Sequence, residues 1–215
     1  MTTPSTPDPF SLPVCAGFLA HSIFASLQET LGDTYYDLLI EQLKRNGADV
    51  ALPEDDPVTQ FPLRKMGDVF AALQKIGGEN GSRGLLQRSG RAWFVHLQRR
   101  SSPPLGIFSP DVLTLPKKMK VKRCGEVLAQ YFQRYMGVEF SVEPSPDHLK
   151  WSFVLPSSAQ ARLMGSGLCD LWFGFWGELL YTLSGGKHHL LKQVVEASTA
   201  YHRWGILIPY LPFEG

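Results

Sequence analysis

The sequence lacks the features that several large classes of protein require. Its three cysteines, Cys15, Cys124 and Cys169, are odd in number and far apart, so they form neither a disulfide framework nor a CxxC metal-binding pair. No apolar run reaches the roughly 18 residues of a membrane-spanning helix. The chain holds 21 Lys and Arg against 20 Asp and Glu, so its charge gives no reason to expect a nucleic-acid partner.

Motifs of catalysis and cofactor binding are also missing. The chain has no GxSxG, no HExxH and no GxGxxG after a strand. The glycine-rich stretch GGENGSRG at residues 77–84 lacks the Lys-Ser/Thr of a phosphate loop and is typical of a turn between helices. The metal-binding side chains near the end of the chain have no dedicated ligand spacing; they are Cys169, His188, His189, Glu196 and His202. We therefore expect no metal and no cofactor, and the sequence gives little support for catalysis.

The start of the chain, MTTPSTPDPFSLP, holds no Lys or Arg and so lacks the basic beginning of a secretory signal. We predict a flexible lead-in over residues 1–13 and a single domain over residues 14–215. Together with the unpaired cysteines, this composition favours a cytoplasmic protein.

Apolar side chains at helical spacing predict helices over five segments, residues 14–31, 34–43, 63–76, 83–97 and 118–135. Glycines at 32, 47, 77 and 78 are expected to end three of them, and the acidic, proline-rich residues 48–62 are expected to form a loop. The basic run Lys117 to Arg123 scatters around the helix axis. We expect solvated side chains there, with an anionic partner or an acidic lipid as the alternative.

After Gly137 the apolar period changes to two, which predicts a strand over residues 138–143 and a returning strand over 151–155. An aromatic helix over residues 169–186 follows, and strand-like segments at 190–199 and 204–211 close the chain. The predicted fold class is therefore α+β, with N-terminal helices and an antiparallel sheet of about four strands. One central aromatic helix lies between the two strand pairs.

The aromatic helix, CDLWFGFWGELLYTLSGG, carries apolar side chains over an arc of roughly 200°, about twice the stripe of an ordinary surface helix. It should therefore be covered on two sides, and Gly174 and Gly177 would let a neighbouring backbone approach. Two interpretations remain open. The rings either fill a central core or line a cavity for an apolar ligand.

Several segments resemble the 4-vinyl-reductase-like, or hydrocarbon-binding, domain family. They are LTLPKKMKVKRCGEVLAQYFQRYMG, a hairpin ending in WSFVLP, and CDLWFGFWGELLYTLSGGKHHLLKQVVEAS. The matching positions are Arg88, Gly90, Arg91, Cys169, Gly174, Gly177, Glu178, residues 184–187, Val195 and Glu196. The resemblance implies a fold similar to Golgi transport-particle subunits. It also implies a bound small hydrophobic molecule, such as an aromatic compound, an acyl chain or a tetrapyrrole precursor, and a link to bacteriochlorophyll synthesis.

In that family the aromatic helix borders the ligand channel, so the resemblance implies a set of ligand-binding residues. They are Trp93, Cys169, Trp172, Phe173 and Trp176, with Arg88 and Arg91 meeting a carboxylate or ketone of the ligand. Thr199 stands where the family commonly has a cysteine, and TAYHRWGIL offers no second thiol, so a zinc site is not expected.

Three functions remain as alternatives on this basis. The first is a soluble module that holds a small hydrophobic molecule without converting it. The second is reduction of a vinyl group on a chlorophyll precursor, which requires a separate electron donor. The third is an assembly subunit with a filled core and no ligand. The resemblance further implies pairing of two copies through their helices.

Overall fold

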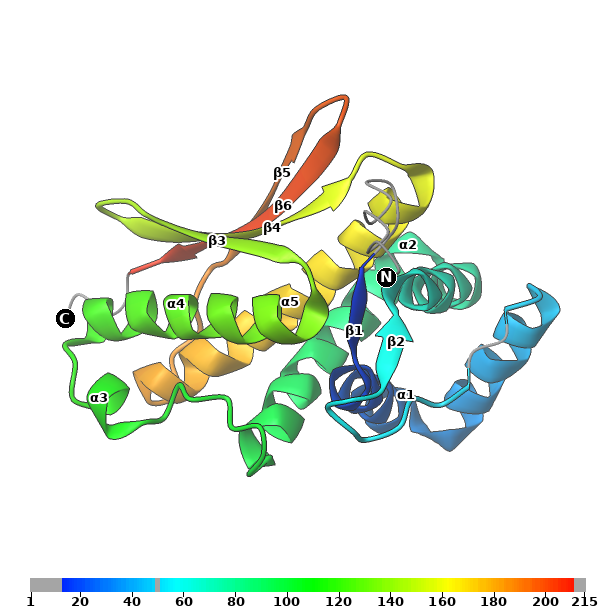
Figure 1. Cartoon of the computed structure of the whole chain (residues 1–215), viewed down its shortest axis with the longest axis horizontal. Coiled ribbons are helices and arrows are strands. Elements are labelled where there is room, and N and C mark those ends of the chain that lie inside the picture. Colours follow the sequence, from blue (N-terminus) through cyan, green and yellow to red (C-terminus); the bar gives the residue numbers. More distant parts are fainter. Residues whose placement is uncertain (1–12, 49–50, 211–215) are drawn as a thin grey trace, which may run out of the picture.

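The computed structural model describes residues 13–48 and 51–210, so the predicted lead-in lies, apart from Pro13, outside the described residues (Figure 1). Within them the fold is α+β, as predicted. The helices are α1 (Gly17–Arg45), α2 (Leu63–Arg99), α3 (Pro110–Leu113), α4 (Lys117–Met136) and α5 (Ala159–Ser184). None of these helices is long and apolar enough to cross a bilayer.

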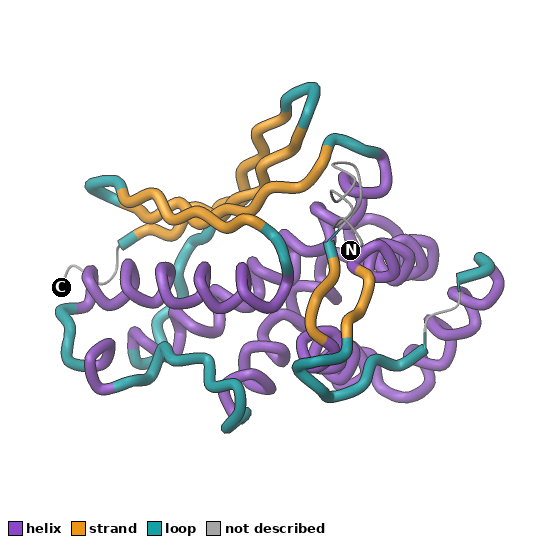
Figure 2. Tube along the Cα trace, viewed as in Figure 1, coloured by secondary structure: helices purple, strands orange, loops and turns teal. Residues whose placement is uncertain are grey.

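The main sheet has four antiparallel strands in the order β3-β4-β6-β5. They are β3 (Glu139–Pro144), β4 (His148–Pro156), β5 (Lys192–Ala197) and β6 (Tyr201–Pro209). Phe140 pairs with Phe153 and Trp151 pairs with Ile206, so the alternating apolar side chains share the face that the helices cover. Figure 2 shows the helices on one side of this sheet and the tips of its two hairpins pointing in different directions.

A second, two-stranded sheet was not predicted. It pairs β1 (Val14–Ala16) with β2 (Gln60–Pro62), two segments that the sequence pattern assigned to a helix and to a loop. Each strand has only three residues, too few for an alternating pattern to be visible. The pairing depends on a partner 48 positions away, as in Val14 with Pro62.

Asn46 and Gly47 follow the end of α1 as predicted, but two other glycines predicted to end helices instead bend them. Gly32 in α1 has φ 69° and ψ 166°, and Gly78 in α2 has φ 66° and ψ 177°, so each helix continues beyond its glycine in a new direction. A positive φ is costly for residues with a Cβ, which explains glycine at both positions. The two bends lie on neighbouring helices and shape the clefts between them.

The aromatic helix begins earlier than predicted. α5 starts at Ala159, where the Ser158 side chain accepts a hydrogen bond from the Ala161 backbone N–H at 3.1 Å. Glycines in its first half obscured the helical pattern, but each has a packing role. A Cβ at Gly165 would overlap the Trp204 ring, and a Cβ at Gly167 would overlap the Phe70 ring.

Two helix backbones meet where α2 and α5 cross. A Cβ at Gly90 would overlap the Leu171 carbonyl of α5, and a Cβ at Gly174 would overlap the Gln87 carbonyl of α2. The predicted close approach at Gly174 is therefore confirmed, whereas the one at Gly177 is wrong, since nothing lies within 4 Å of a Cβ there. On its other side α5 packs against β4 and β6, so the helix is covered on two sides as expected.

Substitution of Gly174 by Ala tests this contact. The added methyl would meet a backbone carbonyl, which cannot move aside as a side chain can, so we expect a loss of about 3 kcal/mol or more in the free energy of unfolding. Urea denaturation measures it. Gly84→Ala is the matched control, because nothing lies within 4 Å of its Cβ position on α2. A Gly174→Ala variant as stable as the Gly84→Ala control would contradict the close contact.

Candidate functional site

Seven rings form a continuous aromatic cluster at the centre of the molecule. Its members are Trp93 of α2, Phe132 of α4, Phe140 of β3, Trp151 of β4, and Trp172, Phe175 and Trp176 of α5. The Trp172 ring contacts five of the others, with centroid distances of 4.2 Å to Phe132, 4.7 Å to Trp93 and 4.7 Å to Trp151. Trp172 and Trp176 are both 0% exposed. In this conformation the rings fill a core.

The indole N–H groups of the cluster are unequally satisfied. Trp93 donates to the Ser22 hydroxyl at 2.9 Å. The indole nitrogens of Trp151, Trp172 and Trp176 are buried without a hydrogen-bond partner among the described residues. Neighbouring ring faces can accept such N–H groups, although more weakly than a carbonyl does.

The remaining residues of the predicted site do not converge on this cluster. The Cys169 thiol is buried and lies 3.9 Å from the Gly205 carbonyl, while Phe173 is half-buried at the edge of the core. Arg88 and Arg91 point into two different surface clefts. A ligand-binding role for these residues stays a prediction, but one ligand in the cluster could not reach both arginines.

None of the three thiols has the character of a nucleophile. Burial raises the pKa of Cys15, Cys124 and Cys169 to about 12 each, so the thiols are neutral at physiological pH. In the described part of the chain no three His, Cys, Asp or Glu side chains gather closely enough to hold a metal ion.

Glu196, one of the metal-binding types noted in the sequence, belongs instead to an ion-pair network on the outer face of the sheet. Lys150 pairs with both Glu196 and Glu143, and Arg203 pairs with Glu143 at 3.0 Å. The network spans all four strands and accounts for these charges without a ligand. In the basic run, Lys122 and Arg123 pair with Glu126, at 3.7 and 3.2 Å.

The first cleft lies between α1 and α2 at the bend of α1, and we call it the Arg88 cleft. Its volume is about 340 Å³, and its lining consists of Thr30, Leu31, Tyr35, Gly81, Leu85 and Arg88. The leucines are half-buried and the Tyr35 ring is 58% exposed. The exposed Arg88 guanidinium forms no ion pair with any described residue. The cleft thus combines an apolar wall with one uncompensated positive charge.

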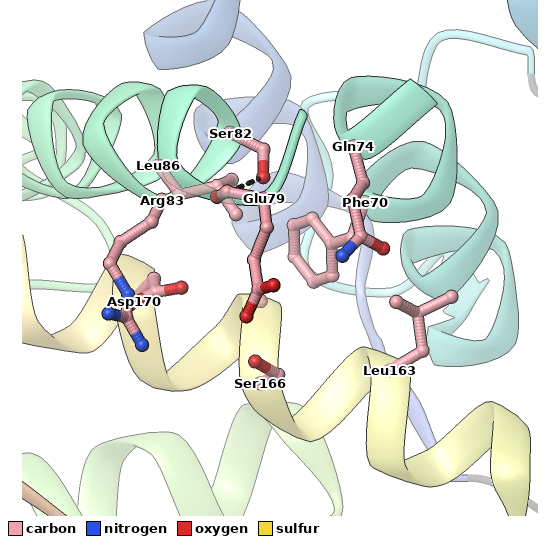
Figure 3. A pocket seen from close by; sticks show the side chains of 10 residues that line it. Phe70, Gln74, Glu79, Ser82, Arg83, Leu86, Leu163, Ser166 and Asp170 are labelled. Atoms are coloured by element: carbon pink, nitrogen blue, oxygen red, sulfur yellow. Dashed lines mark hydrogen bonds and ion pairs between the residues drawn. The ribbon is translucent and has the colours of Figure 1, made fainter. Parts of the chain in front are cut away.

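A smaller hollow, the Asp170 notch, lies at the bend of α2. Figure 3 shows the Glu79 side chain pointing toward α5 and Ser166, with the Phe70 ring on one side and Arg83 and Asp170 on the other. Its volume of about 50 Å³ is sufficient for one or two water molecules. The notch is too small to hold a larger ligand.

Asp170 ties three elements together in this notch. Its carboxylate accepts a hydrogen bond from the Gln193 side chain of β5 at 2.8 Å and pairs with Arg83 of α2 at 3.4 Å. Burial raises the pKa of Asp170 above its ordinary value, and the Gln193 hydrogen bond and the Arg83 charge offset part of that rise. A carboxylate beside the aromatic residues of α5 was the available signal in the sequence.

Comparisons with known proteins identify the fold. No protein-family model matches the chain, and no curated protein matches it in sequence. Among solved structures, an H-NOX domain from work on heme distortion matches 90% of this chain and 94% of its own, at 15% identity and a TM-score of 0.59. A mutant H-NOX domain of T. tengcongensis aligns over 88% of this chain and 96% of its own length, at 16% identity and a TM-score of 0.57. An oxygen-binding H-NOX domain related to soluble guanylate cyclases aligns over 88% of this chain and 94% of its own length, at 15% identity and a TM-score of 0.52.

These matches show a shared fold, and they overturn the resemblance to the 4-vinyl-reductase-like, hydrocarbon-binding family together with its link to bacteriochlorophyll synthesis. Three of the glycines that carried the resemblance have structural roles in this chain. Gly90 and Gly174 allow α2 and α5 to touch, and Gly185, with φ 72°, ends α5 as a left-handed cap. Two helices in backbone contact need glycines at the contact whatever the protein's function. The motifs built on these glycines therefore did not identify a family.

Heme, named for some of the H-NOX structures, does not fit the interior of this chain. A flat macrocycle between two ring faces needs about 7 Å, because each face contact takes about 3.5 Å. The Trp172 ring instead lies 4.2–5.9 Å from its five neighbours. None of the six histidines, His21, His96, His148, His188, His189 and His202, is a buried residue of the core that holds these rings, although the ring nitrogens of His189 are themselves buried.

The raised pKa of Asp170 predicts a pH-dependent stability. A carboxyl whose pKa is higher in the folded state stabilises the fold below the unfolded-state pKa of about 3.9, and this contribution is lost as the pH rises through the folded-state value. Asp170→Asn should therefore be more stable than the parent near pH 7.5, with the difference closing toward pH 4. Urea denaturation at both pH values measures it. A variant less stable at pH 7.5 would show that the pairing with Arg83 outweighs the cost of burial.

The closed cluster predicts that the chain does not take up heme. Hemin added to the purified protein should give no saturable one-to-one Soret band, whereas an H-NOX domain treated in parallel should give one. Absorbance titration provides the measurement. A sharp stoichiometric band from this chain would show that the rings move apart to admit the macrocycle.

Proposed function

We propose that the chain is a binding module for a small aromatic carboxylate, which occupies the Arg88 cleft. The observation that carries the proposal is the unpaired Arg88 guanidinium beside the apolar wall formed by Leu31, Leu85 and the Tyr35 ring. The volume of about 340 Å³ lies at the lower end of the usual range for small-molecule sites. Oxygen binding by a structural relative supports a binding role for this fold.

The chemistry of the cleft selects both parts of such a ligand. A guanidinium presents a planar pair of N–H donors that match the two oxygens of a carboxylate. The half-buried leucines and the tyrosine ring lose contact with water when a flat apolar group covers them. A neutral aromatic molecule would use the wall alone, and a simple carboxylate such as acetate would use Arg88 alone. A molecule with both groups should therefore bind best.

The bends in α1 and α2 give this cleft its shape. Thr30 and Leu31 precede the bend at Gly32, and Tyr35 follows it, so the two directions of α1 form two sides of the cleft. Gly81, Leu85 and Arg88 come from the part of α2 beyond its own bend at Gly78. A ligand in the cleft would thus contact segments of α1 on both sides of its bend.

Isothermal titration with benzoate, benzyl alcohol and acetate tests the proposal. We expect benzoate to bind more tightly than either partial analogue, and Arg88→Gln to weaken benzoate by about tenfold or more, since a charge-assisted hydrogen-bond pair is lost. Arg64→Gln, an exposed arginine of α2 outside the cleft, is the control and should bind benzoate normally. The proposal fails if benzoate does not bind, or binds equally to Arg88→Gln.

A further inference from the structure

A second cleft, the Gly177 cleft, lies beyond the contact between α2 and α5 at the C-terminal end of α5. It is lined by Arg91 of α2, by Gly177, Glu178 and Tyr181 of α5, and by His188 of the following loop, and its volume is about 240 Å³. It shares no lining residue with the Arg88 cleft. A ligand in the Gly177 cleft would therefore bind independently of one in the Arg88 cleft.

Gly177 has no packing role within the molecule. Gly174, one turn earlier, is held against a carbonyl of α2, but a Cβ at Gly177 would meet no atom within 4 Å. Glycine in the interior of a helix stabilises the helix less than alanine does. Gly177 therefore lowers the stability of the fold, and no internal contact compensates for this cost. An open backbone surface on the floor of a cleft is what a closely approaching ligand requires.

The loop that forms one side of the cleft is held in place. The Ser184 hydroxyl accepts a hydrogen bond from the Lys187 N–H and donates one to the Lys187 carbonyl, both at 3.0 Å. The Gly186 N–H donates to the Tyr181 carbonyl at 2.8 Å. The His188 ring then stacks on the Tyr181 ring, with 5.0 Å between centroids and 37° between planes. The aromatic side of the cleft is thus formed before any ligand arrives.

Two opposite charges face the cleft without pairing. Within the described chain, Arg91 and Glu178 form no ion pair with each other or with another side chain, although both line the same cavity. Their charges are complementary to a molecule that carries both signs. A carboxylate would meet the guanidinium, and an ammonium group would meet the Glu178 carboxylate.

We propose that the Gly177 cleft binds a small zwitterion of the α-amino acid type. Its carboxylate contacts Arg91, its ammonium group contacts Glu178, and its Cα lies over the bare backbone of Gly177. A Cβ at position 177 would occupy the space of that Cα. The site thus explains, with one ligand class, the open glycine and the two unpaired charges.

Gly177→Ala separates this proposal from a purely structural account. The variant should melt about 2–4 °C higher, because alanine favours the helix and meets no atom. It should nevertheless bind L-alanine about tenfold or more weakly, by isothermal titration or by NMR line shifts. Gly84→Ala, a helical glycine of α2 with an equally open Cβ position, is the matched control and should gain stability with unchanged L-alanine binding.

Single-charge probes and charge variants complete the test. Acetate and methylamine should each bind more weakly than L-alanine, and Arg91→Gln and Glu178→Gln should each reduce L-alanine binding. Arg88→Gln should leave it unchanged, which distinguishes this site from the Arg88 cleft. The proposal is overturned if L-alanine does not bind, if Gly177→Ala binds it normally, or if acetate binds as tightly as L-alanine.

Discussion

The contact between the backbones of α2 and α5 determines how the rest of the molecule is arranged. Gly90 and Gly174 bring the two helices together without intervening side chains. Beside this contact the rings of α5 pack against rings of α2, α4 and the sheet, where they form the aromatic cluster. Along the helix pair, the Asp170 notch lies on one side of this contact and the Gly177 cleft on the other. The bent α1 then packs on α2 and creates the Arg88 cleft.

The fold is shared with H-NOX domains, whereas the chemistry of the interior is not that of a heme site. The Trp172 ring lies 4.2–5.9 Å from its five neighbours, which leaves no slot for a macrocycle, and no histidine is a buried residue of this core. A fold does not determine a function, because function resides in particular side chains placed on it. In this chain the charged side chains of Arg88, Arg91 and Glu178 line clefts between helices at the surface.

Two features of the helix pair lower stability in the free chain. Asp170 carries a carboxyl group into a mostly buried position, and Gly177 places a glycine where alanine would fit. Asp170 has a structural role, since it joins α5 to α2 and β5. Gly177 has none within the molecule, which is equally true of Gly84 in α2. Gly177 differs in lining a cleft together with Arg91 and Glu178, both unpaired among the described residues, which makes it the stronger indication of an external contact. Residues that reduce stability without an internal benefit are expected where a protein binds something.

The sequence by itself determined the α+β class, the order of the elements and the two-sided cover of the aromatic helix, because apolar periodicity records which faces avoid water. It did not reveal β1 and β2 or the bends at Gly32 and Gly78, since short pairings and helix directions depend on distant segments. Arg88 and Arg91 are three positions apart and were expected to meet one ligand. Only the tertiary structure separates them, because α1 packs beside the first and α5 beside the second. Whether a cleft exists depends on how neighbouring helices cross, and that crossing is fixed by contacts between residues far apart in the chain.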